Sequence, residues 1–96
     1  QVMTRETLPT DVSEIRVFPN PARLGDGLTI QNIPAGGQVR VRTSVGRLVR
    51  EIQAESGGDV IWDGRETSGE LAHSGVYVVE VEGAGGRKRF RVVAER

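Results

Sequence analysis

The chain has 96 residues, of which 36% are hydrophobic and 27% are charged, and its 13 basic residues balance 13 acidic ones. This length fits one domain that buries roughly 60 to 65% of the surface of its unfolded chain, with no room for a deep separate cleft. The chain has no cysteine and a single histidine, which excludes disulfides, thiolate nucleophiles and three-histidine metal sites. Its zero net charge argues against a general electrostatic grip on nucleic acid, so we expect no nucleic-acid partner.

The first 13 residues differ in character from the rest. The segment from Gln1 to Ser13 is polar, contains Pro9 and shows no sustained period of 2 or 3.6 residues, which is typical of a linker or arm. From Glu14 onward, short segments of alternating polarity are separated by Gly, Pro and Asn. We therefore expect an arm over residues 1–13 and one domain over residues 14–96. Because the chain begins at Gln1, we also expect it to be part of a longer protein.

Seven short strands are predicted in residues 14–96. In the third of them, Val39 and Val41 alternate with arginines, which puts apolar and basic side chains on opposite faces. In the fourth, the adjacent Leu48 and Val49 break the alternation and predict a bulge or a half-exposed edge. This pattern predicts an immunoglobulin-like antiparallel β-sandwich, with a small barrel as the alternative. The expected strands are 15–18, 28–33, 38–43, 47–53, 59–62, 75–82 and 87–94.

The last two expected strands form a hairpin whose register can be predicted. If residues 83–86 are its loop, antiparallel pairing sets Glu82 opposite Arg87 and Glu80 opposite Arg89 on one face. A slip by one residue would bury two arginines, at a cost that no surface ion pair offsets. Lys88 is left on the inward face, near the open rim of the hairpin. The core face of the hairpin then carries Tyr77, Val79, Val81, Phe90 and Val92.

Few residues could support catalysis or metal binding. His73 and the neighbouring Ser74 could form a hydrolytic triad with an aspartate, but adjacent residues point apart and no nucleophile-elbow motif surrounds a serine. Asp26, Asp59 and Asp63 could bind Ca²⁺, but they lack the regular spacing of a calcium loop. We therefore expect a protein without enzyme activity, cofactor or metal site.

Trp62 and the last strand each allow two interpretations. Trp62, at a strand end, is expected to anchor the core with its indole N–H on a loop carbonyl, whereas an exposed Trp62 would favour a carbohydrate-binding module. The run from Arg87 to Arg91 could attract an anionic partner, but Glu80 and Glu82 match two of its charges. The unmatched cations, which make the C-terminal end locally positive, are Lys88, Arg91 and Arg96.

A series of short motifs resembles a known family. In chain order they are Val17-Phe18-Pro19-Asn20-Pro21, Val45-Gly46-Arg47-Leu48-Val49, Trp62-Asp63-Gly64-Arg65, Gly69 and Ser74-Gly75-Val76-Tyr77-Val78-Val79, followed by a basic apolar last strand. Over residues 14–96 this series is similar to the C-terminal sorting domain of type IX secretion cargo, a relative of the immunoglobulin-like domain of flagellar hook-capping proteins.

The resemblance implies a signal rather than a catalyst. Such domains end secreted enzymes or adhesins, fold in the periplasm and are recognised by an outer-membrane translocon. A cell-surface sortase then cuts before the domain, here within residues 1–13, and attaches the cargo to anionic lipopolysaccharide. The resemblance thus implies a secreted protein at the cell surface, with a structural spacer or hook-cap domain as an alternative.

Individual recognition residues follow from the same resemblance. Pro19-Asn20-Pro21 marks the start of the domain, and Gly75 and Tyr77 mark its penultimate strand. Lys88 holds the family's basic position in the last strand. The chain departs from the family by having arginine at positions 87, 89 and 91, where lysine is common. The expected recognition residues are Pro19, Asn20, Pro21, Gly75, Tyr77, Lys88, Arg89 and Arg91.

Overall fold

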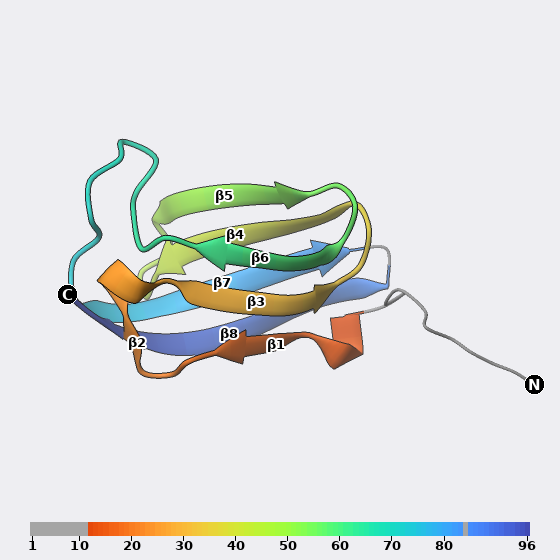
Figure 1. The fold of residues 1–96 in the computed structure, drawn as a ribbon, viewed down its shortest axis with the longest axis horizontal. Helices are drawn as coiled ribbons and strands as arrows, with labels where there is room; N and C mark the ends of the chain where they lie inside the picture. The colour runs from red at the N-terminus through yellow and green to blue at the C-terminus, as the bar shows by residue number, and fades with distance from the viewer. Residues whose placement is uncertain (1–11, 84) are drawn as a thin grey trace, which may run out of the picture.

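The structure, a computed structural model, describes residues 12–83 and 85–96. These residues form eight β-strands and two short 3₁₀ turns, η1 (Val12–Glu14) and η2 (Leu24–Asp26), as Figure 1 shows. The strands are β1 (Arg16–Phe18), β2 (Ala22–Arg23), β3 (Leu28–Ile33), β4 (Gly37–Thr43), β5 (Leu48–Ala54), β6 (Gly58–Trp62), β7 (Gly75–Gly83) and β8 (Gly86–Glu95).

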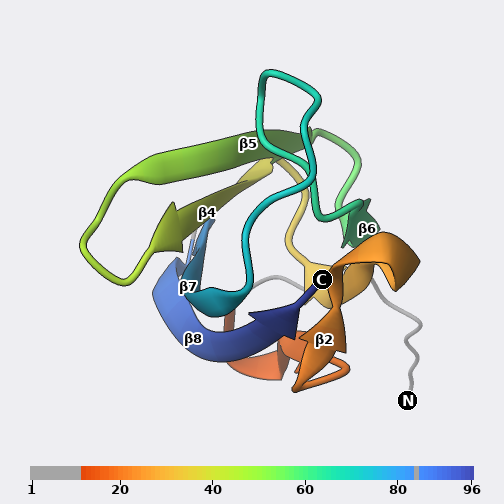
Figure 2. The same ribbon diagram turned by 90° about the vertical axis from the view of Figure 1, so that its left-hand side faces the viewer.

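Two sheets enclose one apolar core. The smaller has the strand order β1-β3-β6 and the larger has the order β2-β8-β7-β4-β5. All strand pairs are antiparallel except β2 with β8, which is parallel. Figure 2 shows that the five-stranded sheet is strongly curled, like half of a barrel. The predicted all-β architecture of two sheets is confirmed, and the curl adds a feature of the barrel alternative.

The seven expected strands occur within one residue of their predicted bounds, and β2 is an eighth strand that the sequence did not predict. β2 has two residues, which is too short for any alternation to show. It exists because the chain crosses from the smaller sheet to the larger after β1 and aligns Ala22 with Ala94 of β8. The prediction of seven strands is therefore corrected to eight.

The irregular strand was predicted correctly. β5 is an edge strand of the larger sheet, and its register with β4 shifts between Val41 and Arg42. The bulge turns Val49 into the core while Leu48 stays exposed. Two adjacent apolar residues in one strand are accommodated in this way.

The core lies between the two sheets and is built mainly from the middle strands. Val39, Val41, Val79 and Val81 of β4 and β7 are completely buried, because alternate residues of each strand face inward. Trp62 is the largest of the fully buried side chains. Burial of one such apolar side chain contributes about 1.5–3 kcal/mol. Leu24, Leu28, Ile30, Ile33, Val49 and Val92 complete the set of large, fully buried side chains.

The arm expected over residues 1–13 falls mostly outside the described residues. In its described part, η1 packs Val12 against the core. Within residues 12–83 and 85–96, no helix is long and apolar enough to cross a membrane.

Candidate recognition surface along the last strand

The predicted register of the last hairpin is confirmed in every pair. β7 and β8 align Glu82 with Arg87 and Glu80 with Arg89, while Lys88 lies opposite Val81. Arg89 Nε donates a hydrogen bond to Glu80 Oε2 at 3.0 Å. The outward face of the hairpin therefore carries the two predicted ion pairs.

Glu80 is the centre of a larger network than the sequence predicted. Its side chain is buried although it is charged, and the residue is only 7% exposed. Guanidinium groups of Arg40, Arg42, Arg87 and Arg89 lie 3.8, 4.0, 3.7 and 3.0 Å from its carboxylate. A buried carboxylate of this kind needs such partners, because an uncompensated charge in the protein is costly.

Arg40 extends the network across β4 to β5. It binds Glu51 at 3.0 Å and Glu82 at 3.1 Å, and it donates a further hydrogen bond to Gln38 at 2.6 Å. Hydrogen bonds to Glu82 and Glu51 raise the pKa of Arg40 above its ordinary value. We call the set of Arg40, Arg42, Arg87, Arg89, Glu51, Glu80 and Glu82 the arginine–glutamate network.

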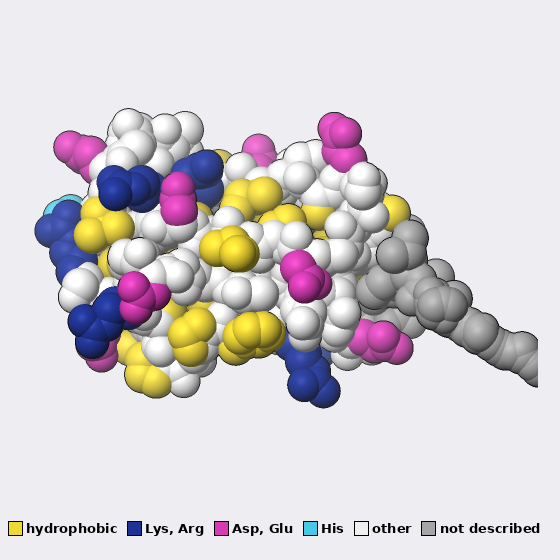
Figure 3. Space-filling view, viewed as in Figure 1, with side chains coloured by type: hydrophobic (Ala, Val, Ile, Leu, Met, Phe, Trp, Pro, Cys, Tyr) yellow, Lys and Arg dark blue, Asp and Glu magenta, His cyan; other side chains and the backbone are white. Residues whose placement is uncertain are grey.

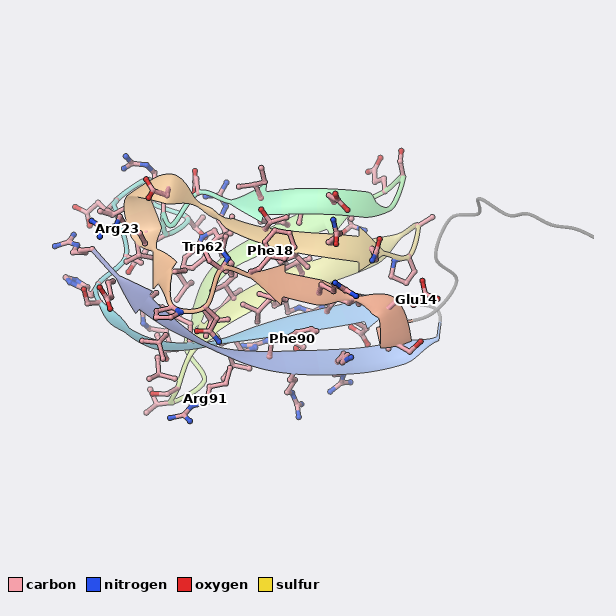
Figure 4. The ribbon with its side chains drawn as sticks, turned by 60° about the horizontal axis from the view of Figure 1, so that its bottom comes forward. Glu14, Phe18, Arg23, Trp62, Phe90 and Arg91 are labelled. Atoms are coloured by element: carbon pink, nitrogen blue, oxygen red, sulfur yellow. The ribbon has the colours of Figure 1, made fainter. Side chains whose placement is uncertain are left out.

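The network leaves β8 positively charged. Four arginines share three glutamates, so the network carries one surplus positive charge. Side chains of Arg87 and Arg89 are 52% and 62% exposed, although each has a glutamate partner. Arg91 adds another exposed cation, for which the described residues provide no acidic partner within 4.0 Å. Figure 4 shows Arg91 on the side of β8 opposite to Phe90.

Lys88 lies on the inward side of β8, as predicted, and is half-buried at the rim. Its Nζ lies 5.3 Å from the centre of the Phe90 ring. Such a cation–π contact contributes about 0.5–1 kcal/mol at an exposed site. Lys88 and Phe90 together form the inward, partly open side of this strand.

Asn20 binds the outer edge of β8 through its side chain. Its Nδ2 donates to the Arg91 carbonyl at 3.0 Å, and its Oδ1 accepts the Val93 N–H at 3.0 Å. Pro19 and Pro21, on either side of Asn20, are exposed, and both follow cis peptide bonds. We call these two hydrogen bonds of Asn20 the Asn20 clamp. The sequence predicted Pro19-Asn20-Pro21 as the start of the domain but not the Asn20 clamp, because no local pattern reveals a contact between residues 71 or 73 positions apart.

Gly75 and Tyr77 occupy structural positions in β7. Gly75 pairs with Ala94, and the Tyr77 ring is buried 5.6 Å from the Trp62 ring. The Tyr77 hydroxyl donates to the His73 carbonyl. Burial raises the pKa of Tyr77 above its ordinary value, and the negative charge of Glu66 adds to this effect.

The core interpretation of Trp62 is confirmed. Trp62 is 1% exposed, and its Nε1 donates to the Arg65 carbonyl at 2.9 Å. An indole buried in this way offers no stacking surface, so the sugar platform that favoured a carbohydrate-binding module is contradicted.

The residues considered for catalysis and metal binding mainly hold the loop between β6 and β7. Asp63 Oδ1 accepts the Arg65 N–H at 3.0 Å, and Ser74 Oγ accepts the Arg96 N–H at 2.9 Å. The described residues contain no group of three or more His, Asp or Glu side chains that could hold a metal ion, and they enclose no pocket.

Arg96, predicted as an unmatched cation at the C-terminal end, has no acidic partner within 4.0 Å among the described residues, but its side chain is held by backbone carbonyls. Its Nε and Nη2 donate to the carbonyls of Ala72 and Leu71, each at 3.0 Å. The guanidinium group is therefore fixed on the loop before β7 with its charge unmatched by an acid, and Lys88 and Arg91 are the unmatched cations within β8.

A second exposed feature lies on the smaller sheet. Phe18, Thr29 and Ile61 occupy one row across β1, β3 and β6. Phe18 is 43% exposed and Ile61 is 66% exposed, and Figure 3 shows apolar side chains gathered on this face. The exposed apolar side chains of this row, Phe18 and Ile61, lie on a different sheet from the basic β8 side chains.

Solved structures resemble the chain, among them the following two, whereas no family model and no curated protein matches it. One is PorZ, an essential bacterial surface component of the type IX secretion system of Porphyromonas gingivalis, with 29% identity and a TM-score of 0.76 over 95% of this chain. The other is dimeric latent PorU from the same organism, with 21% identity and a TM-score of 0.62 over 98% of this chain.

The chain spans 13% of the length of the PorZ chain and 10% of the PorU chain. The similarity to PorU shows the fold alone. The similarity to PorZ, at higher identity, supports an association with type IX secretion. The family resemblance read from the motifs is thus supported at the level of the secretion system.

Proposed function

We propose that the chain is a non-catalytic, immunoglobulin-like module that directs an attached protein through type IX secretion and anchors it at the cell surface. The observation that carries this proposal is the similarity to PorZ over 95% of the chain. In this proposal, an outer-membrane translocon recognises the folded domain after it has reached the periplasm. A sortase then cleaves within residues 1–13 and attaches the upstream enzyme or adhesin to anionic lipopolysaccharide.

The surface along β8 supports recognition by another protein. β7 holds β8 over nearly its whole length, so its outward side chains have fixed positions. Arg89 and Arg91 project from this rigid strand and are exposed. Conversely, Tyr77 is buried, so a partner would meet the basic side chains of β8 rather than the aromatic residue of β7.

The proposed function is tested by export of a reporter. A fluorescent cargo fused before Gln1 is expected to reach the surface of a type IX-competent host, where externally added protease removes it. Retention of this fusion in the periplasm would overturn the proposed function, and it is also the result that a structural spacer or hook-cap domain predicts.

Point variants test recognition more cleanly than a deletion of β8. Removing residues 88–96 would also remove Val92 and Ala94 from the core, so lost export would report unfolding. We expect the double variant Lys88→Ala, Arg91→Ala to fold and to reduce surface fluorescence. Arg23→Ala is the matched control, because Arg23 is an exposed arginine of the same sheet but belongs to β2. Export of the double variant at the level of the control would contradict the proposed recognition residues.

A further inference from the structure

The larger sheet has two edges, and they are covered to different extents. β5 forms one edge, and its bulge together with Thr67, whose N–H and hydroxyl both bind the Val49 carbonyl, blunts that edge. At the other edge, β2 pairs with β8 only at Ala94 and Glu95. Bulges and covering segments prevent unwanted strand pairing, and β5 carries both. Beside β8, the described residues place η1 in contact with the strand but pair no strand with its first half.

The open backbone groups of β8 follow from the Asn20 clamp. Asn20 binds the Arg91 carbonyl and the Val93 N–H, so the odd-numbered residues of β8 point their backbone groups away from β7. Since this direction alternates along an antiparallel strand, the backbone N–H and carbonyl groups of Arg87 and Arg89 also point away from β7, in the plane of the sheet. Upstream of Arg91, no described residue pairs with this edge.

The outward side chains form a row of alternating charge that ends at this open edge. Across β5, β4, β7 and β8 the register aligns Glu51, Arg40, Glu80 and Arg89. Successive members of the row lie 3.0, 3.8 and 3.0 Å apart at their charged atoms. Opposite charges on facing strands stabilise a sheet, so the position beyond Arg89 favours an acidic side chain.

A second copy of the chain does not provide this acid. Antiparallel pairing of two β8 edges about a two-fold axis near Arg89 would place Arg89 opposite Arg89 and Arg87 opposite Arg91. Like charges that face each other directly across strands are destabilising. The arginines of β8 therefore oppose self-pairing and favour a partner of the opposite charge.

We propose that the open edge of β8, from Arg87 to Arg91, accepts an extended segment of a partner protein as an added strand with acidic residues at alternate positions. The acidic side chains lie on the outward face beside Arg87, Arg89 and Arg91, and the intervening residues are apolar and cover the half-buried Phe90. The backbone ladder provides affinity and the alternating charge provides selectivity. This inference deepens the proposed function and rests on it for the presence of a recognition partner.

The test uses the 96-residue chain and a short fluorescent peptide of alternating Glu and Val as the probe. At saturating peptide, hydrogen exchange of the Arg87 and Arg89 amides measured by NMR is expected to slow at least about tenfold. Amides of Lys88 and Phe90 point toward β7 and are expected to change little. Exchange that slows in β5 instead, or at none of these amides, would overturn the proposal.

Charge and backbone are tested by matched probes and variants. A peptide of alternating Lys and Val, and a Glu–Val peptide with N-methylated backbone amides, are both expected to bind more weakly in fluorescence anisotropy. Arg89→Ala is expected to lower the affinity for the Glu–Val peptide about two- to fivefold, because one exposed ion pair is lost. Arg23→Ala is expected to leave binding unchanged. Equal affinity for the Glu–Val and Lys–Val peptides would overturn the proposed selectivity.

Three further outcomes have clear meanings. Protection of Arg87 and Arg89 that grows with protein concentration in the absence of peptide would show self-pairing and overturn the acidic partner. If the peptide binds at β8 but the cargo is not exported, the proposed strand pairing at the β8 edge is supported and the proposed function is overturned. If the cargo is exported but the peptide does not bind, the proposed function is supported and the proposed strand pairing is overturned.

Discussion

Glu80 and Arg89 face each other on neighbouring strands, and their side chains join at 3.0 Å across the outward face of β7 and β8. Glu80 is also reached by the guanidinium groups of Arg40, Arg42 and Arg87. One nearly buried carboxylate thus fixes three strands of the larger sheet to one another. This role sets it apart from Glu82, whose side chain is far more exposed.

Glu80→Gln is expected to destabilise the fold more than Glu82→Gln. Loss of the Glu80 charge leaves its arginines without their shared, partly desolvated partner, which costs about 1–3 kcal/mol. The exposed Glu82 contributes below about 1 kcal/mol, because solvent screens its ion pairs. Urea unfolding followed by Trp62 fluorescence measures both free energies. Equal losses in the two variants would contradict the central position of Glu80.

Asn20 is expected to hold β8 through two separable hydrogen bonds. Asn20→Asp keeps an acceptor for the Val93 N–H but loses the donor to the Arg91 carbonyl, whereas Asn20→Ala loses both. Exchange of the Val93 amide should therefore speed up in the alanine variant and remain slow in the aspartate variant. The alanine variant should lose about 1–2 kcal/mol of stability. Identical exchange in both variants would rule out the clamp.

How well the sequence predicted each feature depends on how local its cause is. The register of Glu80 opposite Arg89 was predictable, because a short loop joins the two strands and a slip would bury charges. The contact of Glu80 with Arg40 was not, because it needs β4 to lie beside β7, and the two residues are 40 positions apart in the chain. Asn20 was missed for the same reason.

Trp62 is expected to report a dry environment. It is the single tryptophan of the chain and is buried beside Tyr77, so its emission should lie at short wavelength and resist quenching by acrylamide. Trp62→Phe keeps an aromatic ring but leaves the Arg65 carbonyl without its donor, which costs about 1–3 kcal/mol. Strong quenching in the native state would contradict the core position.

Gly64 and Gly69 form a matched pair in the loop before β7. Both have positive φ, at 81° and 97°, so alanine at either position costs about 1 kcal/mol for backbone strain. A Cβ on Gly64 would also collide with the Leu24 carbonyl, whereas a Cβ on Gly69 meets open space. Gly64→Ala should therefore be clearly more destabilising than Gly69→Ala in thermal unfolding. Equal melting temperatures would contradict the close approach.

Tyr77 is expected to make the fold sensitive to alkali. Burial favours the neutral hydroxyl, so the folded-state pKa lies above the unfolded value of about 10. Between these two pKa values the unfolded chain binds fewer protons than the folded chain, so the free energy of unfolding falls as pH rises above about 10. Below the unfolded pKa this contribution to stability is fully present.

The chain has one tyrosine, so ultraviolet absorbance of the tyrosinate follows Tyr77 directly. Its titration midpoint in the folded protein should exceed that of the chain unfolded in urea. Tyr77→Phe removes the ionisation together with the hydrogen bond to the His73 carbonyl. The variant should therefore be less stable than the wild type at neutral pH, and the difference should shrink as pH rises above about 10. Coincident tyrosinate midpoints in the folded and unfolded chains would contradict burial of the hydroxyl as the cause of the shift.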